Sequence, residues 1–543
     1  MDTPFAITLQ VGSSLANSTG SWRTERPVYV HNQAPCGGAC PAREDPQAWL
    51  QRAEEGHYEE AWREIMRVNP FPAVMGRVCY HPCESACNRG RLDESVGINA
   101  VERFLGDEAI ARGWTVGPRR PRTGRRVLVV GAGPSGLAAA YHLRRMGHDV
   151  AIHDAAGDPG GMMRHGIPAY RLPRDVLDAE IARILGLGIE LHTGSRVRDL
   201  RDAMSDGGFD AAFVAVGAHL GRRAYVPAGN AARILDAISL LHDVAEGESP
   251  RLGRRVVVQG GGNTALDAAR TATRLGADEA VVVYRRTRDR MPAHAAELRE
   301  ATEEGIVMRW LSTIHHVDGG RVTLERMELD ESGMPRPTGQ LEELEADAVV
   351  LAIGQDADLS LLEGLEDVEI ADGVVHVGPE LMTGHAGVFA GGDIVPAERT
   401  VTMAVGHGTT AARHIDAWLA GRRHQEPPRA PTAAYESLNT WYFSDAPAQL
   451  RPMLDLARRR STFDEVVGGL DTDTALFEAR RCLSCGSCLA CDNCYGVCPD
   501  NAVIKLEPGG PYAYAFDLDH CKGCGLCMAE CPAGAIAMEP ELV

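Results

Sequence analysis

The sequence contains 15 cysteines, yet none lies between Cys87 and Cys482. This gap excludes a redox-active cysteine pair, and any disulfide, from the central part of the chain. The sequence also lacks an apolar run of about 18 residues, which argues against a transmembrane helix. Its first thirty residues lack the basic start and apolar core of a secretory signal. We therefore expect a globular cytoplasmic protein whose cysteines bind metal rather than form disulfides.

Basic residues are also in short supply. The chain has 55 Lys and Arg against 75 Asp and Glu, a formal net charge of −20. A phosphate-binding surface needs concentrated Lys and Arg, so nucleic acid and anionic membranes are not expected as partners. The length of 543 residues predicts roughly three or four domains.

The C-terminal cysteines form two matching runs with the spacing Cys-x2-Cys-x2-Cys-x3-Cys-Pro. This is the spacing of bacterial two-cluster ferredoxins, in which the fourth cysteine of each run binds the other cluster. Structural zinc is the alternative, but zinc sites use four ligands in two pairs rather than eight in two equal runs. The predicted ligands are Cys488, Cys491, Cys494 and Cys531 for one 4Fe-4S cluster, and Cys521, Cys524, Cys527 and Cys498 for the other.

A first dinucleotide fingerprint, Gly131-Ala-Gly133-Pro134-Ser135-Gly136, follows the predicted strand Val127–Val130 and opens a helix. Its glycines permit a tight turn and close approach of a pyrophosphate, whose charge the helix N-terminus favours. Asp154 ends the next predicted strand and is placed to accept a hydrogen bond from a ribose hydroxyl. Gly392 and Asp393 belong to a stretch that resembles the late flavoprotein motif, whose aspartate holds the ribityl chain. These features predict bound FAD.

A second fingerprint, Gly260-Gly-Gly262-Asn263-Thr264-Ala265, predicts a nicotinamide nucleotide site. The following strand ends in Arg285 and Arg286, where an NAD enzyme carries an acidic residue, so a 2′-phosphate can be paired and NADPH is favoured over NADH. The alternative is that these arginines form a solvated face. His407 is interpreted as a packing residue or a flavin contact. No constellation of acid, base and nucleophile marks a further site, so we predict no catalytic side chain.

These patterns predict an α/β multidomain protein with an N-terminal helical iron-sulfur domain, two nested Rossmann-like nucleotide-binding domains for FAD and NAD(P), and a C-terminal ferredoxin-like α+β domain. The apolar segments Ala348–Ala352 and Val388–Ala390 indicate that the chain returns to the FAD-binding fold after the second fold. The expected boundaries are 1–120 for the helical domain, 121–240 and 341–425 for the FAD-binding domain, 241–340 for the NAD(P)-binding domain, 426–481 for a linker, and 482–543 for the ferredoxin domain.

Over roughly residues 31 to 420 the chain resembles a family that contains the small subunit of NADPH-dependent glutamate synthase, the large subunit of the NADH-dependent ferredoxin:NADP oxidoreductase and the N-terminal half of dihydropyrimidine dehydrogenase. The resemblance implies that Gly161, Met162 and Arg171 contribute to cofactor binding. The residues that carry it are both fingerprints, Cys36-x3-Cys40-Pro41, Gly76-Arg-Val-Cys79-x3-Cys83-Glu84-x2-Cys87, Gly161 to Pro168, Arg171-Leu-Pro173, Tyr284 to Arg286 and Ala390 to Asp393.

The resemblance also implies two 4Fe-4S clusters in the helical domain. One of them would be held by Cys40, Cys79 and Cys83, together with Glu102 at a position where the family carries Glu or Gln. The alternative for Glu102 is an ordinary surface position on a helix. Both readings depend on where the predicted helix around Ile98 places this carboxylate.

The second cluster of the helical domain departs from the family pattern. Its Cys-x2-Cys pair would fall at Val28 and His31, and valine has no ligating atom. The chain has a surplus pair elsewhere, because Cys482-x2-Cys485 precedes the ferredoxin runs and belongs to neither of their sets. We hypothesise that this C-terminal pair folds back and completes the second N-terminal cluster together with Cys36 and Cys87. The alternatives are four free buried thiols, or an incidental C-terminal pair. The hypothetical set is Cys36, Cys87, Cys482 and Cys485.

We therefore expect an iron-sulfur flavoprotein that transfers electrons in either direction between NAD(P)H and a redox partner subunit or ferredoxin, within a hetero-oligomer. The appended ferredoxin domain is similar to that of nicotinamide-linked subunits of 2-oxoacid oxidoreductases or other low-potential reductases. The alternatives are a stand-alone NAD(P)H:ferredoxin oxidoreductase, a glutamate synthase small subunit, which lacks such an appendage, and a scaffold subunit whose cofactors are structural.

Overall fold

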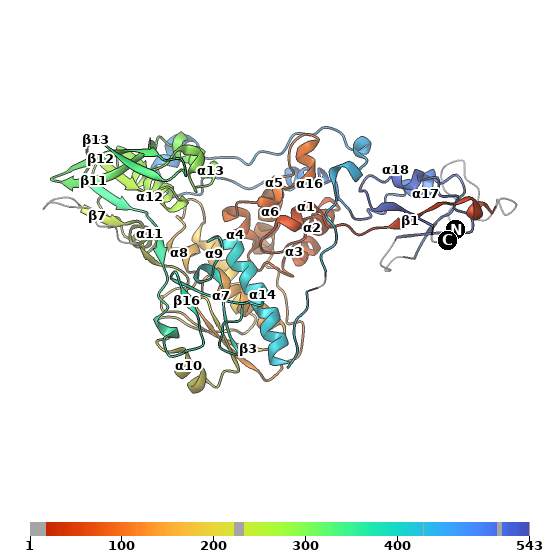
Figure 1. The fold of residues 1–543 in the computed structure, drawn as a ribbon, viewed down its shortest axis with the longest axis horizontal. Coiled ribbons are helices and arrows are strands. Elements are labelled where there is room, and N and C mark those ends of the chain that lie inside the picture. The colour runs from red at the N-terminus through yellow and green to blue at the C-terminus, as the bar shows by residue number, and fades with distance from the viewer. Residues whose placement is uncertain (1–17, 222–232, 427, 508–512, 542–543) are drawn as a thin grey trace.

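The computed structural model describes residues 18–221, 233–426, 428–507 and 513–541. A ferredoxin-like part lies at one end of the molecule, a helical part lies in the middle, and two lobes built on parallel sheets lie beyond it (Figure 1). The first and last described residues lie at the ferredoxin end, where the Glu541 N–H group donates to the Thr24 carbonyl oxygen. Among the described residues, no helix combines the length and the apolarity that a membrane crossing requires.

The first lobe is a five-stranded parallel sheet with the strand order β18-β5-β2-β3-β4. Its valine-rich strands are buried on both faces, as parallel strands covered by helices are. Two long helices, α7 (Pro134–Arg145) and α14 (Val401–Leu419), pack against each other beside it. The strands are β2 (Arg126–Val130), β3 (Asp149–His153), β4 (Glu190–His192), β5 (Ala211–Val214) and β18 (Val388–Ala390).

The second lobe is a parallel sheet with the order β10-β9-β8-β14-β7, flanked by α11 (Ala237–Ala245), α12 (Asn263–Arg274) and α13 (Ala295–Glu303). An antiparallel sheet, β11 (Ser312–Asp318), β12 (Arg321–Leu329) and β13 (Pro335–Glu345), leads out of it. The strands of the parallel sheet are β7 (Arg233–Asp236), β8 (Arg255–Gln259), β9 (Glu279–Tyr284), β10 (Val307–Trp310) and β14 (Ala348–Leu351).

The nesting of the two lobes differs in detail from the sequence prediction. We expected Ala348–Ala352 to return to the first lobe, but β14 lies between β8 and β7 in the second. Strand β7 also joins the second sheet, although it lies before the expected boundary at residue 241. An apolar run predicts a buried strand but does not show which sheet the strand joins. Strand β18 is the one that returns to the first lobe.

The helical part contains short helices, several of which begin at a proline. Pro46 occupies the first position of α2, and the Asp45 carboxylate accepts a hydrogen bond from the Ala48 N–H group at 3.2 Å. Helices α4 and α6 touch so closely that a Cβ at Gly106 would lie 2.3 Å from the Ala73 nitrogen. The helices are α1 (Pro35–Ala39), α2 (Pro46–Glu54), α3 (Tyr58–Ile65), α4 (Pro72–Val78), α5 (Pro82–Ser85) and α6 (Ile98–Ala111).

Residues 426–481, expected as a linker, are partly built into the other domains. Helix α16 (Thr472–Arg480) packs on α2 and α6, and α15 (Leu456–Ser461) packs on α12. The buried Glu478 carboxylate accepts from the Gly97 N–H group at 2.6 Å, just before α6 begins. This segment therefore reaches the helical part and the second lobe.

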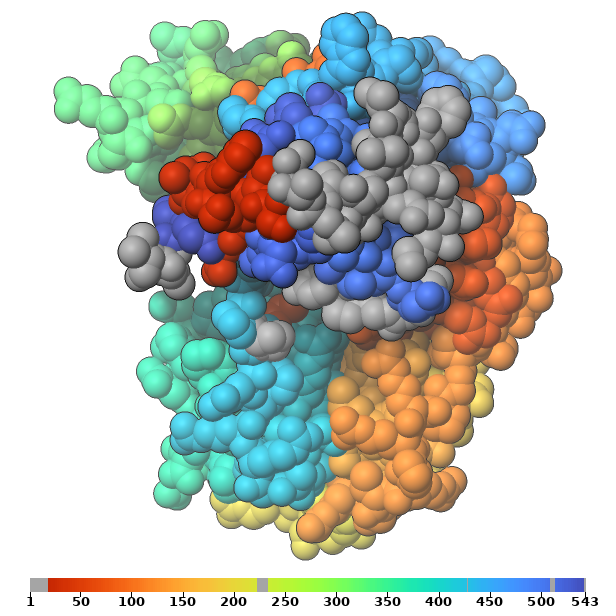
Figure 2. Space-filling view, turned by 90° about the vertical axis from the view of Figure 1, so that its right-hand side faces the viewer, coloured from red at the N-terminus to blue at the C-terminus, as the bar shows by residue number. Residues whose placement is uncertain are grey.

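The ferredoxin-like part begins earlier in sequence than expected. Strand β1 (Glu25–Tyr29) pairs antiparallel with β21 (Ile536–Pro540), and the Tyr29 ring stacks on Phe516 with centroids 4.8 Å apart. Figure 2 shows this N-terminal strand lying against the C-terminal domain. Val28 faces Ala537 in this pairing. The other elements are α17 (Asn493–Val497), β19 (Val503–Lys505), β20 (Tyr514–Phe516) and α18 (Leu526–Ala529).

Candidate cofactor sites

A cavity of about 490 Å³ opens at the carboxyl ends of β2, β3 and β5, where ligands of doubly wound sheets bind. Most of the residues predicted to hold FAD line it. They are Gly131, Gly133, Pro134, Ser135, Asp154, Gly161, Met162, Gly392 and Asp393.

The glycines of the first fingerprint make close backbone contacts that a side chain would prevent. Gly131 has φ +108°, and a Cβ there would lie 2.3 Å from the Ala215 carbonyl oxygen. A Cβ at Gly136 would lie 1.9 Å from the Gly131 oxygen. The Ser135 hydroxyl, beside the start of α7, is buried and has no hydrogen-bond partner among the described residues. The turn therefore fits a pyrophosphate that approaches the helix N-terminus.

The two predicted aspartates are held in different ways. Asp154 accepts hydrogen bonds from the N–H groups of Ala132 and Ala156 and so orders the turn, while it also lines the cavity. Asp393 is mostly buried, and burial raises its pKa. His407 Nδ1 accepts from the Gly392 N–H group at 3.1 Å, and burial lowers the pKa of this imidazole. A neutral His407 thus supports the turn that presents Asp393.

A second cavity, of about 410 Å³, lies at the second fingerprint and is lined by Gly260, Gly262, Thr264, Arg285 and Arg286. A Cβ at Gly260 would lie 2.3 Å from the carbonyl oxygen of the residue after β14. The Arg286 Nε atom is buried without a hydrogen-bond partner in the described part of the chain, as expected for a group that meets a ligand.

Four residues of the predicted nucleotide sites lie outside both cavity linings: Gly136, at the tight turn of the first fingerprint, and Asn263, Ala265 and Arg171. Asn263 Oδ1 accepts from the His294 N–H group at 2.9 Å, and Ala265 is buried in α12. Arg171 forms buried ion pairs with Asp267 and Glu297, at 2.8 and 2.5 Å, which fasten the first lobe to the second. Its role toward a cofactor stays a prediction.

Sequence reasoning did not single out several residues that line the cavities. His165, Arg196 and His242 line the first cavity, and Gln259 and Thr313 line the second. They come from helices, a loop and strands that are far apart in sequence, and none belongs to a fingerprint. Only the fold brings them together.

The two cavities share a wall. Ile238, in the first turn of α11, lines both of them. Neither lining contains a cysteine, so a dithiol cannot take electrons there. A flavin and a nicotinamide held in these cavities would meet across α11.

A first group of side chains that can bind a metal lies between α1, α4 and α6. The pKa of the Cys83 thiol is raised by burial and by the nearby charges of Glu84, Cys79, Cys40 and Glu102, which places the four predicted ligands together. Glu102 is 6% exposed, so the surface-helix alternative for it is wrong. Four sulfur and oxygen donors around one point fit an iron-sulfur cluster.

Polar residues surround Glu102. Asn69 Nδ2 donates to Glu102 at 2.9 Å and to the buried Glu44 at 2.8 Å. Burial raises the pKa of Glu44 to about 7 and that of Glu102 well above its usual range. The amide therefore orients the two carboxyl groups, and a hydrogen bond of this kind fixes the position of a metal ligand.

A second group joins the two ends of the chain. The pKa of the Cys36 thiol is raised by burial and by the charges of Cys482, Cys87 and Cys485. Asn88 Nδ2 donates to the Cys485 sulfur at 3.5 Å across 397 positions of sequence. The four residues of the hypothetical set thus lie together, and Cys36 and Cys485 belong to one hydrophobic core with the helical part and the first lobe.

The ferredoxin-like part holds two further groups, each around a small cavity. The first is lined by Cys488, Cys491, Cys494 and Cys531, and the second by Cys498, Cys521, Cys524 and Cys527, as the crossed pattern predicts. The N–H groups of Ala502 and Ala535 donate to the sulfurs of Cys498 and Cys531 at 3.2 and 3.3 Å.

Comparison with protein families matches three parts of the chain. Residues 125–408 match pyridine nucleotide-disulphide oxidoreductases, residues 15–114 match the dihydropyrimidine dehydrogenase domain II with a 4Fe-4S cluster, and residues 487–535 match a 4Fe-4S dicluster domain. The chain belongs to the pyridine nucleotide-disulphide oxidoreductase family. This oxidoreductase combines an FAD- and NAD(P)-binding unit with iron-sulfur domains at both ends, which confirms the predicted fold class and resemblance.

Among curated relatives, this oxidoreductase is 38% identical over 504 residues to the NADP(+)-dependent formate dehydrogenase subunit beta of Moorella thermoacetica, covering 83% of the chain and 70% of the relative. It is 36% identical to the NADPH-Fe(3+) oxidoreductase subunit beta of Geobacter sulfurreducens, covering 73% and 66%. It is 31% identical to the glutamate synthase [NADPH] small chain of Escherichia coli, covering 71% and 88%. The chain thus spans about two thirds of the length of the first two relatives.

Proposed function

We propose that this chain is the nicotinamide-linked subunit of an oxidoreductase complex and passes electrons between NADPH and a partner through FAD and four 4Fe-4S clusters. Bound FAD supplies the conversion between a two-electron hydride and single electrons. The chain's own residues hold the sites in order and keep each one next to the following one.

The observation that carries the proposal is that consecutive sites share short elements. Ile238 separates the two nucleotide cavities. At the start of α14, Ala404 lines the FAD cavity, and the Thr402 hydroxyl, which donates to the Met75 sulfur at 3.8 Å, lies near the Cys79 thiol and counters the rise that burial causes in the pKa of Cys79. Helix α1 joins the two cysteine groups of the helical part. Cys40 directly follows α1 and belongs to the first group, and Cys36 lies in α1 and belongs to the second.

The path continues into the ferredoxin-like part. Cys485 belongs to the second group, and Cys488, three residues later, lines the first ferredoxin cavity. Cys494 and Cys498, in and just after α17, belong to the two ferredoxin sets. Cysteines only three or four positions apart in sequence therefore connect each cysteine group to the next.

The outer end of the path faces solvent. Cys491 and Cys524, one from each ferredoxin set, are exposed. A partner that docks there can exchange electrons at short range. The named beta-subunit roles of the two relatives support a partner subunit, and a stand-alone NAD(P)H:ferredoxin oxidoreductase would use the same surface.

NADPH is favoured over NADH by the position of the arginines. Arg285 and Arg286 both line the second cavity just after β9, where the family's acidic ribose ligand would otherwise stand. A guanidinium pairs a 2′-phosphate through charge-assisted hydrogen bonds.

Two measurements on anaerobically purified protein test the proposal. Iron analysis should give about sixteen irons per chain, at four per cluster, together with one FAD. Titration with NADPH should bleach the flavin and then the cluster absorption. No bleaching with NADPH or NADH would overturn the electron-transfer role and favour a scaffold. Isolation of the native complex then decides between a partner subunit and a free ferredoxin.

A further inference from the structure

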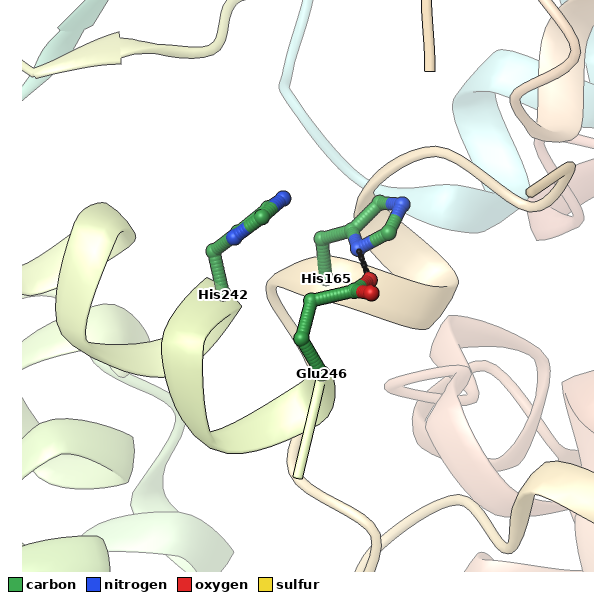
Figure 3. Close-up of side chains that lie close together, drawn as sticks. All are labelled: His165, His242 and Glu246. Carbon is green, nitrogen blue, oxygen red and sulfur yellow. Dashed lines mark ion pairs between the residues drawn. The ribbon is translucent and has the colours of Figure 1, made fainter. Parts of the chain in front are cut away.

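Two histidines and a glutamate meet where the two lobes touch. His165 ends the short helix α8 (Met162–His165) of the first lobe, and His242 and Glu246 lie one turn apart at the end of α11. Figure 3 shows the imidazole of His165 facing the Glu246 carboxylate, with the ring of His242 beside them. The His165 Nδ1 and Glu246 Oε1 atoms are 3.3 Å apart, and the two rings stack with centroids 4.8 Å apart.

The buried imidazole of His165 contacts the Glu246 carboxylate as an ion pair and not through a hydrogen bond. The His165 side chain is 12% exposed, and both ring nitrogens are buried without a hydrogen-bond partner among the described residues. Buried polar atoms of this kind call for a ligand.

The donor set selects the kind of ligand. One ligand atom from each of the three side chains lies within 4.8 Å of the others. Two imidazoles and one carboxylate suit a divalent transition metal, whereas Mg²⁺ and Ca²⁺ prefer oxygen ligands. With metal–ligand bonds of about 2.0–2.1 Å, a tetrahedral site needs ligand atoms about 3.4 Å apart. His242 and Glu246 are about half exposed, so their side chains have room to close by that amount.

We propose that His165, His242 and Glu246 form a reversible binding site for one divalent transition-metal ion of the zinc class. The i,i+4 spacing of His242 and Glu246 places two ligands on one face of α11, and His165 supplies the third from the other lobe. The fourth coordination position is open on the side of the first cavity, which both histidines line.

The position of the site gives it a consequence, which rests on the proposed function. Helix α11 follows β7 of the second sheet, and its first turn carries Ile238, the wall between the two nucleotide cavities. A metal ion bound at the far end of α11 would fasten this helix to α8. We expect the bound ion to restrict movement between the lobes and to slow reduction of the flavin by NADPH.

Direct metal binding is the first test and does not depend on activity. The holoprotein is dialysed against micromolar Zn²⁺, and zinc and iron per chain are measured by mass spectrometry. The unmodified chain should bind one zinc more than His242→Ala. In Glu246→Gln the dissociation constant should rise more than about tenfold, since even outer partners of a metal ligand contribute that much. Equal zinc in all three proteins, with full iron content, would overturn the site.

A matched control separates the site from an ordinary surface pair. His57 and Glu55 form an exposed pair in the helical part, with His57 Nδ1 and Glu55 Oε2 3.4 Å apart, and thus offer one imidazole and one carboxylate. His57→Ala should retain the extra zinc. Loss of the same zinc in this variant would show that the metal binds nonspecifically, and would contradict the proposal.

The second test measures rate. Zn²⁺ should slow flavin reduction by NADPH in the unmodified chain, a chelator should restore the rate, and His242→Ala should be insensitive. Zinc binding without slowing would overturn the effect on the lobes and leave the site intact. If NADPH fails to reduce the flavin even without zinc, the proposed function fails, and the zinc count still decides the metal site.

Discussion

Each nucleotide cavity in the middle of the chain takes its glycine turn from one short stretch of sequence, whereas one cysteine group at the ends combines residues that are nearly the whole chain apart. The first arrangement makes a site local, so a change there alters a ligand contact. The second makes a site part of the tertiary structure. A substitution in this cysteine group should therefore remove a cluster and lower stability together. A substitution in a nucleotide cavity should weaken nucleotide binding.

The largest effect is expected where the two ends meet. In the double variant Cys482→Ser, Cys485→Ser we expect the loss of one cluster, about four of about sixteen irons. Flavin reduction by NADPH should persist, but the ferredoxin clusters should no longer be reduced within the same turnover. Iron analysis and rapid-mixing absorbance measure both. Cys491→Ser, which alters an exposed ferredoxin ligand, is the control and should leave the inner clusters reducible.

Unchanged iron in the double variant would sink the idea that these sulfurs bind a cluster. Iron loss with wild-type reduction of the ferredoxin clusters would instead show that the group binds metal but lies off the electron path.

The second effect concerns the contacts that hold the C-terminal pair in place. Arg481 is 2% exposed, pairs with the buried Glu478 at 2.6 Å, and donates to the Ser95 and Glu94 carbonyl oxygens at 2.9 and 2.6 Å. Arg481→Ala leaves Glu478 buried without this partner. We expect a loss of about 3–5 kcal/mol in the free energy of unfolding.

Urea unfolding under anaerobic conditions, followed by intrinsic fluorescence, measures this loss. The neighbouring Arg480 is exposed, and Arg480→Ala should change stability by no more than about 0.5 kcal/mol. Equal effects of the two substitutions would show that the long-range contacts of Arg481 do not hold the segment.

The third effect belongs to the middle and should be confined to one ligand. Arg286→Ala removes a charge from the wall of the second cavity. We expect KM for NADPH to rise about 10- to 100-fold, the equivalent of about 1.5–3 kcal/mol for a hydrogen bond to a charged group, with KM for NADH unchanged. Steady-state kinetics with both nucleotides measures the ratio. Arg288, exposed and outside the cavity lining, is the control position. An equal rise for NADH would contradict a 2′-phosphate contact.

The same contrast explains how far the sequence could be read. The fingerprint glycines and the ferredoxin cysteines lie where their spacing predicts, because a turn or a loop of fixed length determines their geometry. The grouping of Cys36 with Cys482 was reached by counting unused thiols, and the structure brings them together. Local pattern places strand β14 in the wrong lobe and does not indicate β1 as a ferredoxin strand, because strand pairing depends on tertiary structure.

The smallest effect is expected at the contact between α15 and the second lobe. Glu304, buried in the second lobe, pairs with Arg270 and Arg274, and Arg459 of α15 donates to it at 3.2 Å. Burial opposes its charge, but the hydrogen bonds of Arg270 and Arg274 outweigh burial and lower its pKa to about 2 from an ordinary 4.5. The folded chain therefore binds this proton less tightly than the unfolded chain does.

Because the folded pKa is the lower one, the contribution of Glu304 to stability is complete above about pH 4.5 and is lost as the pH falls toward 2. Urea unfolding of the full chain should show Glu304→Gln less stable than the unmodified protein at pH 7, with the difference shrinking by about 1 kcal/mol near pH 4. Glu303, the half-exposed partner of Arg459, provides the matched variant, Glu303→Gln, whose effect should stay within about 1 kcal/mol. A difference for Glu304→Gln that is constant from pH 7 to about 4 would mean that the carboxylate charge contributes nothing, and that α15 is held to the second lobe by packing alone.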